Sequence, residues 1–277
     1  MQNMKPVCLC LSRDNTRLFV TDRENHRVQV LNKEDGTFIQ TIGNGKGAGP
    51  GYFNSPEGVC ISPDGSELYV ADRYNNRINV FNPIDGSYVR RLVGRRLVDE
   101  TRIFLEEPRG ICISSDGELL YVADFNGVQV LSVDGAHIRT INVQNPPARW
   151  DEPHFPPVGL CLSRNNELLF VTTYFGDIVV FRTSDDTIST RFDIRVHTGG
   201  APSNICLSPD GEELYISQTR YDFVQVLRIA NGSLIQRIGE YGQTAGKMYG
   251  PQGVCVSPDG EMFVADTGNN RIQVFQM

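Results

Sequence analysis

The sequence has no long apolar run, no excess of basic residues and few histidines, and each shortage argues against one class of function. No apolar stretch approaches the roughly 18 residues that indicate a membrane span, so no membrane contact is expected. The 33 Asp and Glu residues outnumber the 26 Lys and Arg residues, which gives a net charge of −7. This acidic balance argues against a polyanion as the main partner.

The chain also begins without the features of a secretion signal, and its cysteines lack the spacing of a disulfide framework. Residues Met1 to Pro6 contain no signal-peptide pattern. The number of cysteines is seven, which is odd, and six of them recur at one repeated position. We therefore expect a cytoplasmic protein with reduced thiols.

One short phrase recurs along nearly the whole chain. It consists of Pro, any residue, a mostly small residue, an aliphatic residue, Cys, an aliphatic residue and Ser. The serines that end the copies are 45 to 52 residues apart, and self-similarity at such a period is typical of repeat folds. The copies begin at Pro6, Pro56, Pro108, Pro157, Pro202 and Pro251.

Each repeat contains four short stretches that read as β-strands, which we name a, b, c and d in chain order. In the second repeat they are residues 59–62, 67–71, 78–81 and 88–93. A turn of Ser-Pro-Asp-Gly separates the first two, because Pro presets φ and Gly tolerates positive φ. No segment is long and periodic enough to indicate a helix.

Six such units predict an all-β fold, a six-bladed β-propeller of four-stranded antiparallel blades that occupies residues 1–277 as one domain. The predicted blades span residues 6–43, 56–94, 108–142, 157–193, 202–239 and 251–277.

Three repeats share a further phrase between strands b and c, which resembles that of the NHL-repeat family. The matching segments are Val20-Thr-Asp-Arg-Glu-Asn-His-Arg-Val-Gln-Val30, Val70-Ala-Asp-Arg-Tyr-Asn-Asn-Arg-Ile-Asn-Val80 and Val264-Ala-Asp-Thr-Gly-Asn-Asn-Arg-Ile-Gln-Val274. The linker from Gly45 to Phe53 is also similar to the segment that joins blades in this family. The resemblance covers essentially the whole chain and implies the propeller fold. It says little about function, because one fold hosts many activities.

The chain departs from the repeat pattern in two places. The third, fourth and fifth repeats lack the Asp/Asn/Arg loop, and the sixth stops after its strand c. The last blade is therefore expected to lack its outer strand in this chain, which leaves residues Ile272 to Phe275 as an open edge. Such an edge favours pairing with another strand, so it is a candidate for contact with a partner or a second copy; a solvated edge is the alternative.

The six repeated cysteines are interpreted as packing residues. Equivalent positions in neighbouring sheets are about 10 Å apart, which is too far for a disulfide bond. Zinc ligands must crowd round one ion, and only Cys8 lies near another cysteine in the sequence. A small apolar side chain on the innermost strand instead lets the next blade approach closely. The six are Cys10, Cys60, Cys112, Cys161, Cys206 and Cys255.

The chemistry of the loops points to one face of the ring. In an up-and-down blade the b–c loops and the linkers between blades share a face, which we name the loop face; the a–b and c–d turns share the other, the turn face. Aromatic and arginine side chains, which anchor interfaces, are frequent in the loop-face segments of the third to fifth blades. We expect them to bind a protein partner, although they could instead only cover the blade ends. They are Arg95, Arg96, Phe125, Arg149, Trp150, His154, Phe155, Tyr174, Phe175, Arg220 and Tyr221.

Two other functions are less favoured by the residues. Some NHL-repeat proteins bind RNA on this face, but the loops and linkers of this chain sum to a charge of −2, and RNA binding needs a basic patch. Some six-bladed relatives are metal-dependent lyases or esterases, which need converging His and carboxylate ligands. No histidine follows a repeat proline, where side chains would line the channel mouth; the residues there are Val7, Glu57, Arg109, Val158, Ser203 and Gln252. No cofactor or metal is expected. The sequence favours a non-catalytic scaffold, such as the substrate-recruiting part of a ubiquitin-ligase-like or signalling protein.

Overall fold

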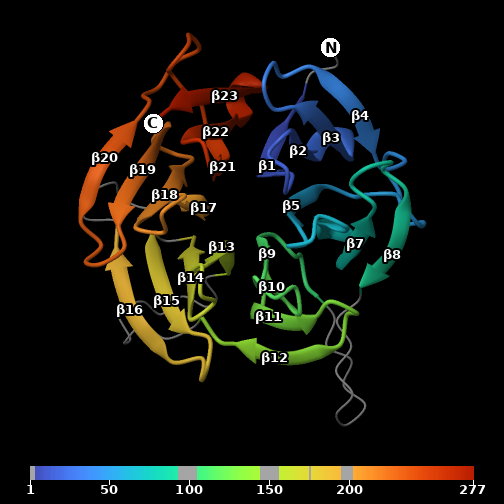
Figure 1. Cartoon of the computed structure of the whole chain (residues 1–277), viewed down its shortest axis with the longest axis horizontal. Helices are drawn as coiled ribbons and strands as arrows, with labels where there is room; N and C mark the ends of the chain where they lie inside the picture. The colour runs from blue at the N-terminus through green and yellow to red at the C-terminus, as the bar shows by residue number, and fades with distance from the viewer. Residues whose placement is uncertain (1–3, 93–104, 144–155, 175, 195–201) are drawn as a thin grey trace.

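A computed structural model describes residues 4–92, 105–143, 156–174, 176–194 and 202–277, and its strands form six antiparallel sheets round a central axis (Figure 1). Five sheets have four strands in chain order, and the sixth has three. The prediction of a six-bladed propeller with an incomplete last blade is confirmed. In Figure 1, strand a of every blade lies innermost, and strand d lies outermost in the five blades that have four strands.

The strands fall into blades as follows. The first blade contains β1 (Pro6–Leu11), β2 (Arg17–Asp22), β3 (Arg27–Asn32) and β4 (Phe38–Ile42). The second contains β5 (Pro56–Ile61), β6 (Leu68–Asp72), β7 (Arg77–Phe81) and β8 (Tyr88–Leu92). The third contains β9 (Ile111–Ile113), β10 (Leu119–Asp124), β11 (Gly127–Ser132) and β12 (His137–Ile141).

The other three blades repeat this order. The fourth contains β13 (Pro157–Leu162), β14 (Leu168–Thr173), β15 (Asp177–Arg182) and β16 (Ile188–Asp193). The fifth contains β17 (Pro202–Leu207), β18 (Glu213–Gln218), β19 (Phe223–Arg228) and β20 (Leu234–Ile238). The sixth contains β21 (Pro251–Val256), β22 (Glu261–Asp266) and β23 (Arg271–Gln276).

The repeated serine builds the turn from strand a to strand b. The Ser62 hydroxyl donates a hydrogen bond to the Asp64 carboxylate and accepts one from the backbone N–H of Glu67 at 2.9 Å. Gly65 adopts a φ of +75°, which a side chain would disfavour. The turn therefore follows from its residues before any packing between blades.

The core lies between the blades. Strand b is buried on both of its faces because it is covered by the blades before and after it, and this explains its continuous apolar run in β6. Between the first and second blades, Phe53 and Phe81 contact with ring centroids 5.3 Å apart. Six such clusters follow one another round the ring.

The repeated cysteines pack where the sequence predicted. Each contacts the apolar cluster between its own blade and the next one; Cys10 faces the second blade and Cys60 the third. Burial raises the pKa of each of these thiols, because the thiolate would lose its hydration. All seven cysteines are free. The predicted place of these cysteines in the packing between blades is confirmed.

Substitution of one of these cysteines should show how closely neighbouring blades pack at this position. Cys112→Ala is expected to have a small effect on the free energy of unfolding, whereas Cys112→Leu should lower it by about 1–3 kcal/mol because the cluster between the third and fourth blades is overpacked. Urea-induced unfolding would measure both. Rapid labelling of all six repeated thiols in the native protein would contradict the packing interpretation.

Neighbouring blades also approach through their backbones near the axis. The N–H of Gly58 donates to the carbonyl of Arg109 in the third blade at 2.8 Å. Elsewhere a hydroxyl on strand b bridges the gap: Thr21 accepts from the N–H of Cys8 at 2.9 Å and donates to the carbonyl of Glu57 at 2.7 Å. These hydrogen bonds satisfy polar groups in the region where the sheets converge.

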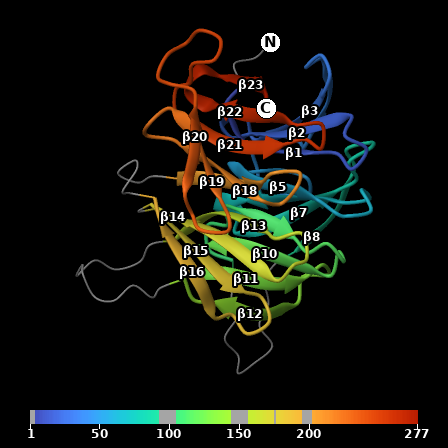
Figure 2. The same ribbon diagram turned by 60° about the vertical axis from the view of Figure 1, so that its left-hand side comes forward.

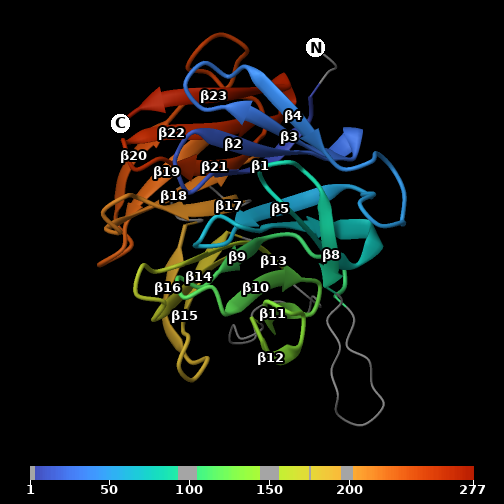
Figure 3. The same cartoon turned by 45° about the vertical axis from the view of Figure 1, so that its right-hand side comes forward.

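The ring closes without a shared strand. Lys33 of the first blade forms ion pairs with Asp259 and Glu261 of the sixth, and the Thr267 hydroxyl donates to the carbonyl of Pro6 at 2.6 Å. The innermost strands β1 and β21 lie side by side. Figures 2 and 3, which turn the ring in opposite directions, show the same two strands as neighbours. Among the described residues, no helix has the length and apolar character needed to cross a membrane.

Candidate functional site

The b–c loops are held by a buried carboxylate at the end of strand b. In the second blade Asp72 is fully buried, and one of its oxygens accepts from the N–H of Asn54 at 2.6 Å. The other oxygen accepts from Asn75 at 2.8 Å and from Nε of Arg77 at 2.7 Å. Asp22 and Asp266 form equivalent ion pairs with Arg27 and Arg271. The Asp/Asn/Arg phrase is therefore architectural.

The arginine of this phrase fastens the preceding linker to the loop. The guanidinium of Arg77 donates to the carbonyls of Ala48, Gly49 and Tyr52 at 2.8, 3.0 and 2.7 Å. Arg271 binds three carbonyls of the linker before the sixth blade in the same way. Linkers and b–c loops thus share a face, which confirms the predicted loop face for these blades. A loop so fastened offers its exposed side chains from a fixed backbone.

Charged side chains of the first three blades pair across the start of the innermost strands. Arg23 and Arg73 both bind Glu57, at 3.3 and 3.1 Å, and Arg73 also binds Glu107 at 2.7 Å. Arg109 approaches Glu107 at 3.6 Å. The hydrogen bond from Arg73 holds the pKa of Glu107 below its usual value. The sequence pattern does not predict this cluster, because its members come from different blades.

Four of the predicted partner-binding residues lie on the loop face among the described residues. The Arg220 guanidinium lies 6.0 Å from the centre of the Tyr174 ring, so the cation contacts an aromatic face across the fourth and fifth blades. Tyr221 packs against Phe223, with ring centroids 6.3 Å apart. Phe125 is part of the b–c loop of the third blade and is partly exposed. Seven predicted residues lie outside the described residues: Arg95, Arg96, Arg149, Trp150, His154, Phe155 and Phe175.

The loop face carries further exposed aromatic side chains outside the third to fifth blades. Tyr74 is 52% exposed beneath the Arg73 guanidinium, which is 4.8 Å from its ring centre. Tyr241 and Tyr249, in the linker to the sixth blade, contact edge to face at 5.6 Å. The sequence contained a signal for Tyr74. The same position of the Asp/Asn/Arg phrase is occupied by Glu24 in the first blade and by Gly268 in the sixth, so the fold does not require an aromatic side chain there.

Histidines and carboxylates do not converge in the part of the chain that the structure describes. No group of three or more His, Cys, Asp or Glu side chains there has the arrangement of a metal site. His26 adopts a positive φ at the end of its loop, and its Nδ1 accepts from the N–H of Ser55 at 3.0 Å. Partial burial lowers the pKa of His26, which favours the neutral ring that can accept this hydrogen bond.

Comparison with known proteins gives a consistent result. A model of the NHL repeat matches residues 248–275, and a model described as a 6-bladed beta-propeller matches residues 9–194. The chain is 24% identical over 102 residues to NHL-repeat-containing protein 4 of Mus musculus, which covers 37% of this chain and 69% of that protein. Among solved structures, the hydrazine synthase of Kuenenia stuttgartiensis superposes with a TM-score of 0.71 at 15% identity, covering 100% of this chain and 97% of the other. At that identity the likeness concerns the fold alone.

Proposed function

The chain belongs to the NHL-repeat family of six-bladed β-propellers, and from this membership we propose that it is a non-catalytic scaffold that binds a protein partner through its loop face. Propellers of this family commonly serve as protein-interaction scaffolds. More specifically, we propose that the protein recruits a substrate for a ubiquitin-ligase-like or signalling assembly in the cytoplasm.

The observation that carries the proposal is the pair formed by Tyr174 and Arg220. Tyr174 is 46% exposed, and its hydroxyl lies 3.4 Å from Nη2 of Arg220. Tyrosine and arginine are the side chains that most often dominate binding energy. Because the two come from adjacent blades and already contact each other, a partner would order them at a small entropic cost.

The electrostatics of the loop face support a protein rather than a polyanion as partner. The arginines near the channel mouth are matched by Glu57 and Glu107, so most of their charge is already neutralised. A nucleic acid would have to compete with these carboxylates for each guanidinium, and little counterion release would reward it.

Removal of the pair should weaken partner binding. For the double variant Tyr174→Ala with Arg220→Ala we expect an affinity loss of about 30-fold or more, since two interface anchors are removed. The partner would be isolated from extracts with the wild-type protein, purified, and titrated calorimetrically against wild type and variant. The matched control is Arg13→Ala with Ile84→Ala, which changes two exposed side chains of the turn face.

The outcomes separate the candidate functions. The scaffold proposal requires that the turn-face control binds normally and that nuclease treatment leaves the complex intact. A loop-face variant that binds as tightly as wild type would refute the role of this face. A partner released by nuclease, with an affinity that falls steeply as salt is raised, would instead indicate RNA binding.

A further inference from the structure

The exposed aromatic side chains of the ring are concentrated on its loop face. Eight aromatic side chains are exposed in the part of the chain that the structure describes, and only Phe38, on an outer strand, lies elsewhere. A face that gathers large rings in this way is typical of an interaction surface. The seven on the loop face are Tyr52, Tyr74, Phe125, Tyr174, Tyr221, Tyr241 and Tyr249.

Contacts link some of these side chains from the fourth blade to the fifth. Tyr174 of the fourth blade contacts Arg220, in the b–c loop of the fifth blade. Tyr221 follows Arg220 in the chain, and its ring packs against that of Phe223 with the two planes tilted by 35°. The guanidinium of Arg237, on the outer strand β20, lies 5.1 Å from the centre of the Phe223 ring. The loop of the fifth blade therefore continues the aromatic surface that begins at Tyr174.

The same surface extends over the linker to the sixth blade. The N–H of Gly250 donates to the Asp222 carboxylate at 2.7 Å, which joins the end of the linker to the b–c loop of the fifth blade. Tyr249 precedes Gly250 in the chain and contacts Tyr241 edge to face. Figure 1 shows the three blades concerned side by side in the ring. We name the whole surface the tyrosine track; it consists of Tyr174, Arg220, Tyr221, Phe223, Tyr241 and Tyr249.

The rings of Tyr241 and Tyr249 form an open corner of the track. Their planes are at 89° and their centroids 5.6 Å apart, and the two side chains are 69% and 49% exposed. The backbone beneath them is fixed, because the N–H of Tyr249 donates to the buried Asp266 carboxylate and its carbonyl accepts from the N–H of Gly268, both at 2.7 Å. A flat apolar ring of a ligand can therefore pack into this corner without rearrangement of the backbone.

The track offers hydrogen-bond donors, whereas its main-chain acceptors are largely in use. The hydroxyls of Tyr221, Tyr241 and Tyr249 have no hydrogen-bond partner among the described residues. The linker carbonyls already accept hydrogen bonds, three of them from the guanidinium of Arg271. A segment with many N–H groups would find few free acceptors here, whereas a segment rich in carbonyls would meet the hydroxyls and the Arg220 guanidinium. The linker carbonyls in use are those of Glu240, Gly242, Gln243, Thr244, Lys247, Met248 and Tyr249.

The track and the charged residues beside it carry no net charge. Arg220 and Lys247 are balanced by Asp222 and Glu240, and Lys247 pairs with Glu240 at 3.0 Å. A polyanion such as RNA gains little from a neutral surface, because few counterions are released. The electrostatics therefore favour an uncharged segment as the occupant.

Given the proposed function of the loop face, on which this assignment rests, we propose that the tyrosine track binds a proline-rich segment of the partner in the polyproline II conformation. Proline has no N–H group, and the carbonyls of a polyproline II helix make no internal hydrogen bonds, so the segment supplies what the track can bind. Its pyrrolidine rings pack on the tyrosine rings, and its preformed backbone loses little entropy on binding. A β-strand would need a sheet edge for its own N–H groups, and the track consists of loop residues and of Phe223, at the start of an internal strand.

Titration of a fluorescein-labelled decaproline peptide against the 277-residue chain tests the proposal by fluorescence polarisation. We expect saturable binding that changes little when the salt concentration is raised, because no ion pair is formed. The double variant Tyr221→Ala with Tyr241→Ala should bind about tenfold or more weakly, since two aromatic anchors are lost. Tyr221→Phe with Tyr241→Phe should bind about threefold more weakly, since it keeps the rings and loses the hydroxyl donors.

Tyr74→Ala is the matched control for these variants. It removes a comparably exposed tyrosine of the same face, in the second blade and outside the track, and it should bind decaproline as wild type does. A glycine–serine peptide of the same length, which lacks the preformed helix, should show no saturable binding, and this arm does not depend on the folding of any protein variant. Decaproline should also displace the partner isolated with the wild-type protein.

Several results would overturn the proposal: no saturable binding of decaproline, equal binding of the glycine–serine peptide, or an equal loss of affinity in Tyr74→Ala. A uridine oligonucleotide that binds more tightly than decaproline, and loses affinity as salt is raised, would also overturn it and indicate a surface for nucleic-acid bases. If decaproline does not displace the partner but Tyr174→Ala with Arg220→Ala still weakens partner binding, the loop face is a partner site and only the proline-rich segment is wrong. If that double variant binds the partner normally, the proposed function itself fails.

Discussion

Replacement of Asp72 by alanine is expected to lower the free energy of unfolding by about 3–5 kcal/mol, because it leaves a buried cation without its counter-charge. Asp72 is fully buried and Arg77 is 4% exposed. The same carboxylate also accepts hydrogen bonds from the N–H of Asn54 and from Asn75 and Asn79. Denaturation in urea, followed by circular dichroism, would measure the loss.

Asp124 in the third blade provides the matched control. It is equally buried and accepts from Gln129 at 3.1 Å and from the N–H groups of Glu106 and Asn126 at 3.2 and 2.9 Å. Gly127 replaces the arginine in this blade, and burial raises the pKa of Asp124. Asp124→Ala should therefore cost less than Asp72→Ala, since no buried guanidinium is left behind. Equal losses in the two variants would show that the ion pair contributes nothing beyond its hydrogen bonds.

Gly58→Ala is expected to destabilise the protein by about 3 kcal/mol or more, at the upper end of overpacking effects. A Cβ atom at this position would lie 2.2 Å from the carbonyl oxygen of Arg109 and 3.0 Å from the backbone nitrogen of Ile111. Both are backbone atoms of the next blade, so neither can rotate away. The two sheets would have to separate near the axis, and the hydrogen bond between Gly58 and Arg109 would lengthen.

An alanine elsewhere separates this steric effect from the general effect of replacing glycine. In Gly49→Ala the new Cβ would approach only the side chain of Tyr52, at 3.3 Å, in a part of the linker that is only half-buried. Its thermal unfolding should match that of wild type. If Gly58→Ala unfolds at the same temperature as Gly49→Ala, the close approach of the second and third blades is not important for stability.

The sequence revealed the features that each blade repeats. The turn at Ser62 depends on residues near each other in the chain, and several copies display the same pattern. The packing position of Cys60 was recognisable because a cysteine recurs at the same place in all six repeats. Such local rules can be recognised without coordinates. The missing outer strand of the sixth blade was also predictable, because five complete copies define what a blade contains.

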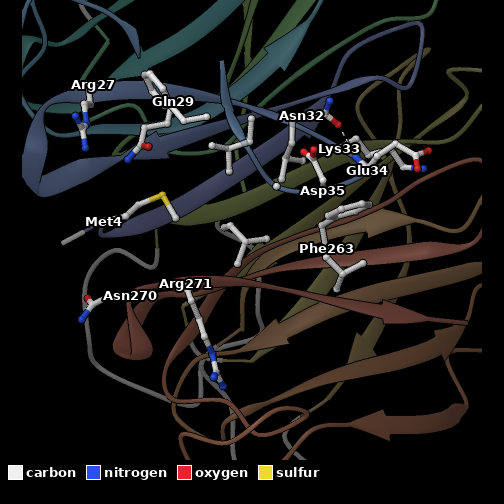
Figure 4. Close-up of a pocket in the computed structure, with 16 residues that line it drawn as sticks. Met4, Arg27, Gln29, Asn32, Lys33, Glu34, Asp35, Phe263, Asn270 and Arg271 are labelled. Atoms are coloured by element: carbon white, nitrogen blue, oxygen red, sulfur yellow. Dashed lines mark hydrogen bonds between the residues drawn. The ribbon is translucent and has the colours of Figure 1, made fainter. Parts of the chain in front are cut away.

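Contacts between different blades were not predictable in the same way. Glu57 of the second blade pairs with Arg23 of the first, and Lys33 of the first blade pairs with carboxylates of the sixth that are more than 200 residues away. No copy of the repeat contains both partners of such a contact, so a pattern search cannot find it. A cavity of about 920 Å³ (Figure 4), lined by Val274 of the sixth blade, was missed for a related reason: an open edge was expected, but Phe38 and Leu31 of the first blade form part of the cavity wall. The third blade kept its buried carboxylate, Asp124, although its loop had lost the family phrase.

The closure by Lys33 has a consequence for the order of events during synthesis. Interfaces between successive blades can form as the chain leaves the ribosome, since each needs only the next few dozen residues. The contact of Lys33 with Asp259 spans 226 residues, so Leu9, Leu18 and Val20 of the first blade remain uncovered until the sixth blade has been translated. Apolar surface exposed for so long is a target for aggregation and for chaperones. The chain is therefore most prone to aggregation in the time between the synthesis of the first blade and that of the last.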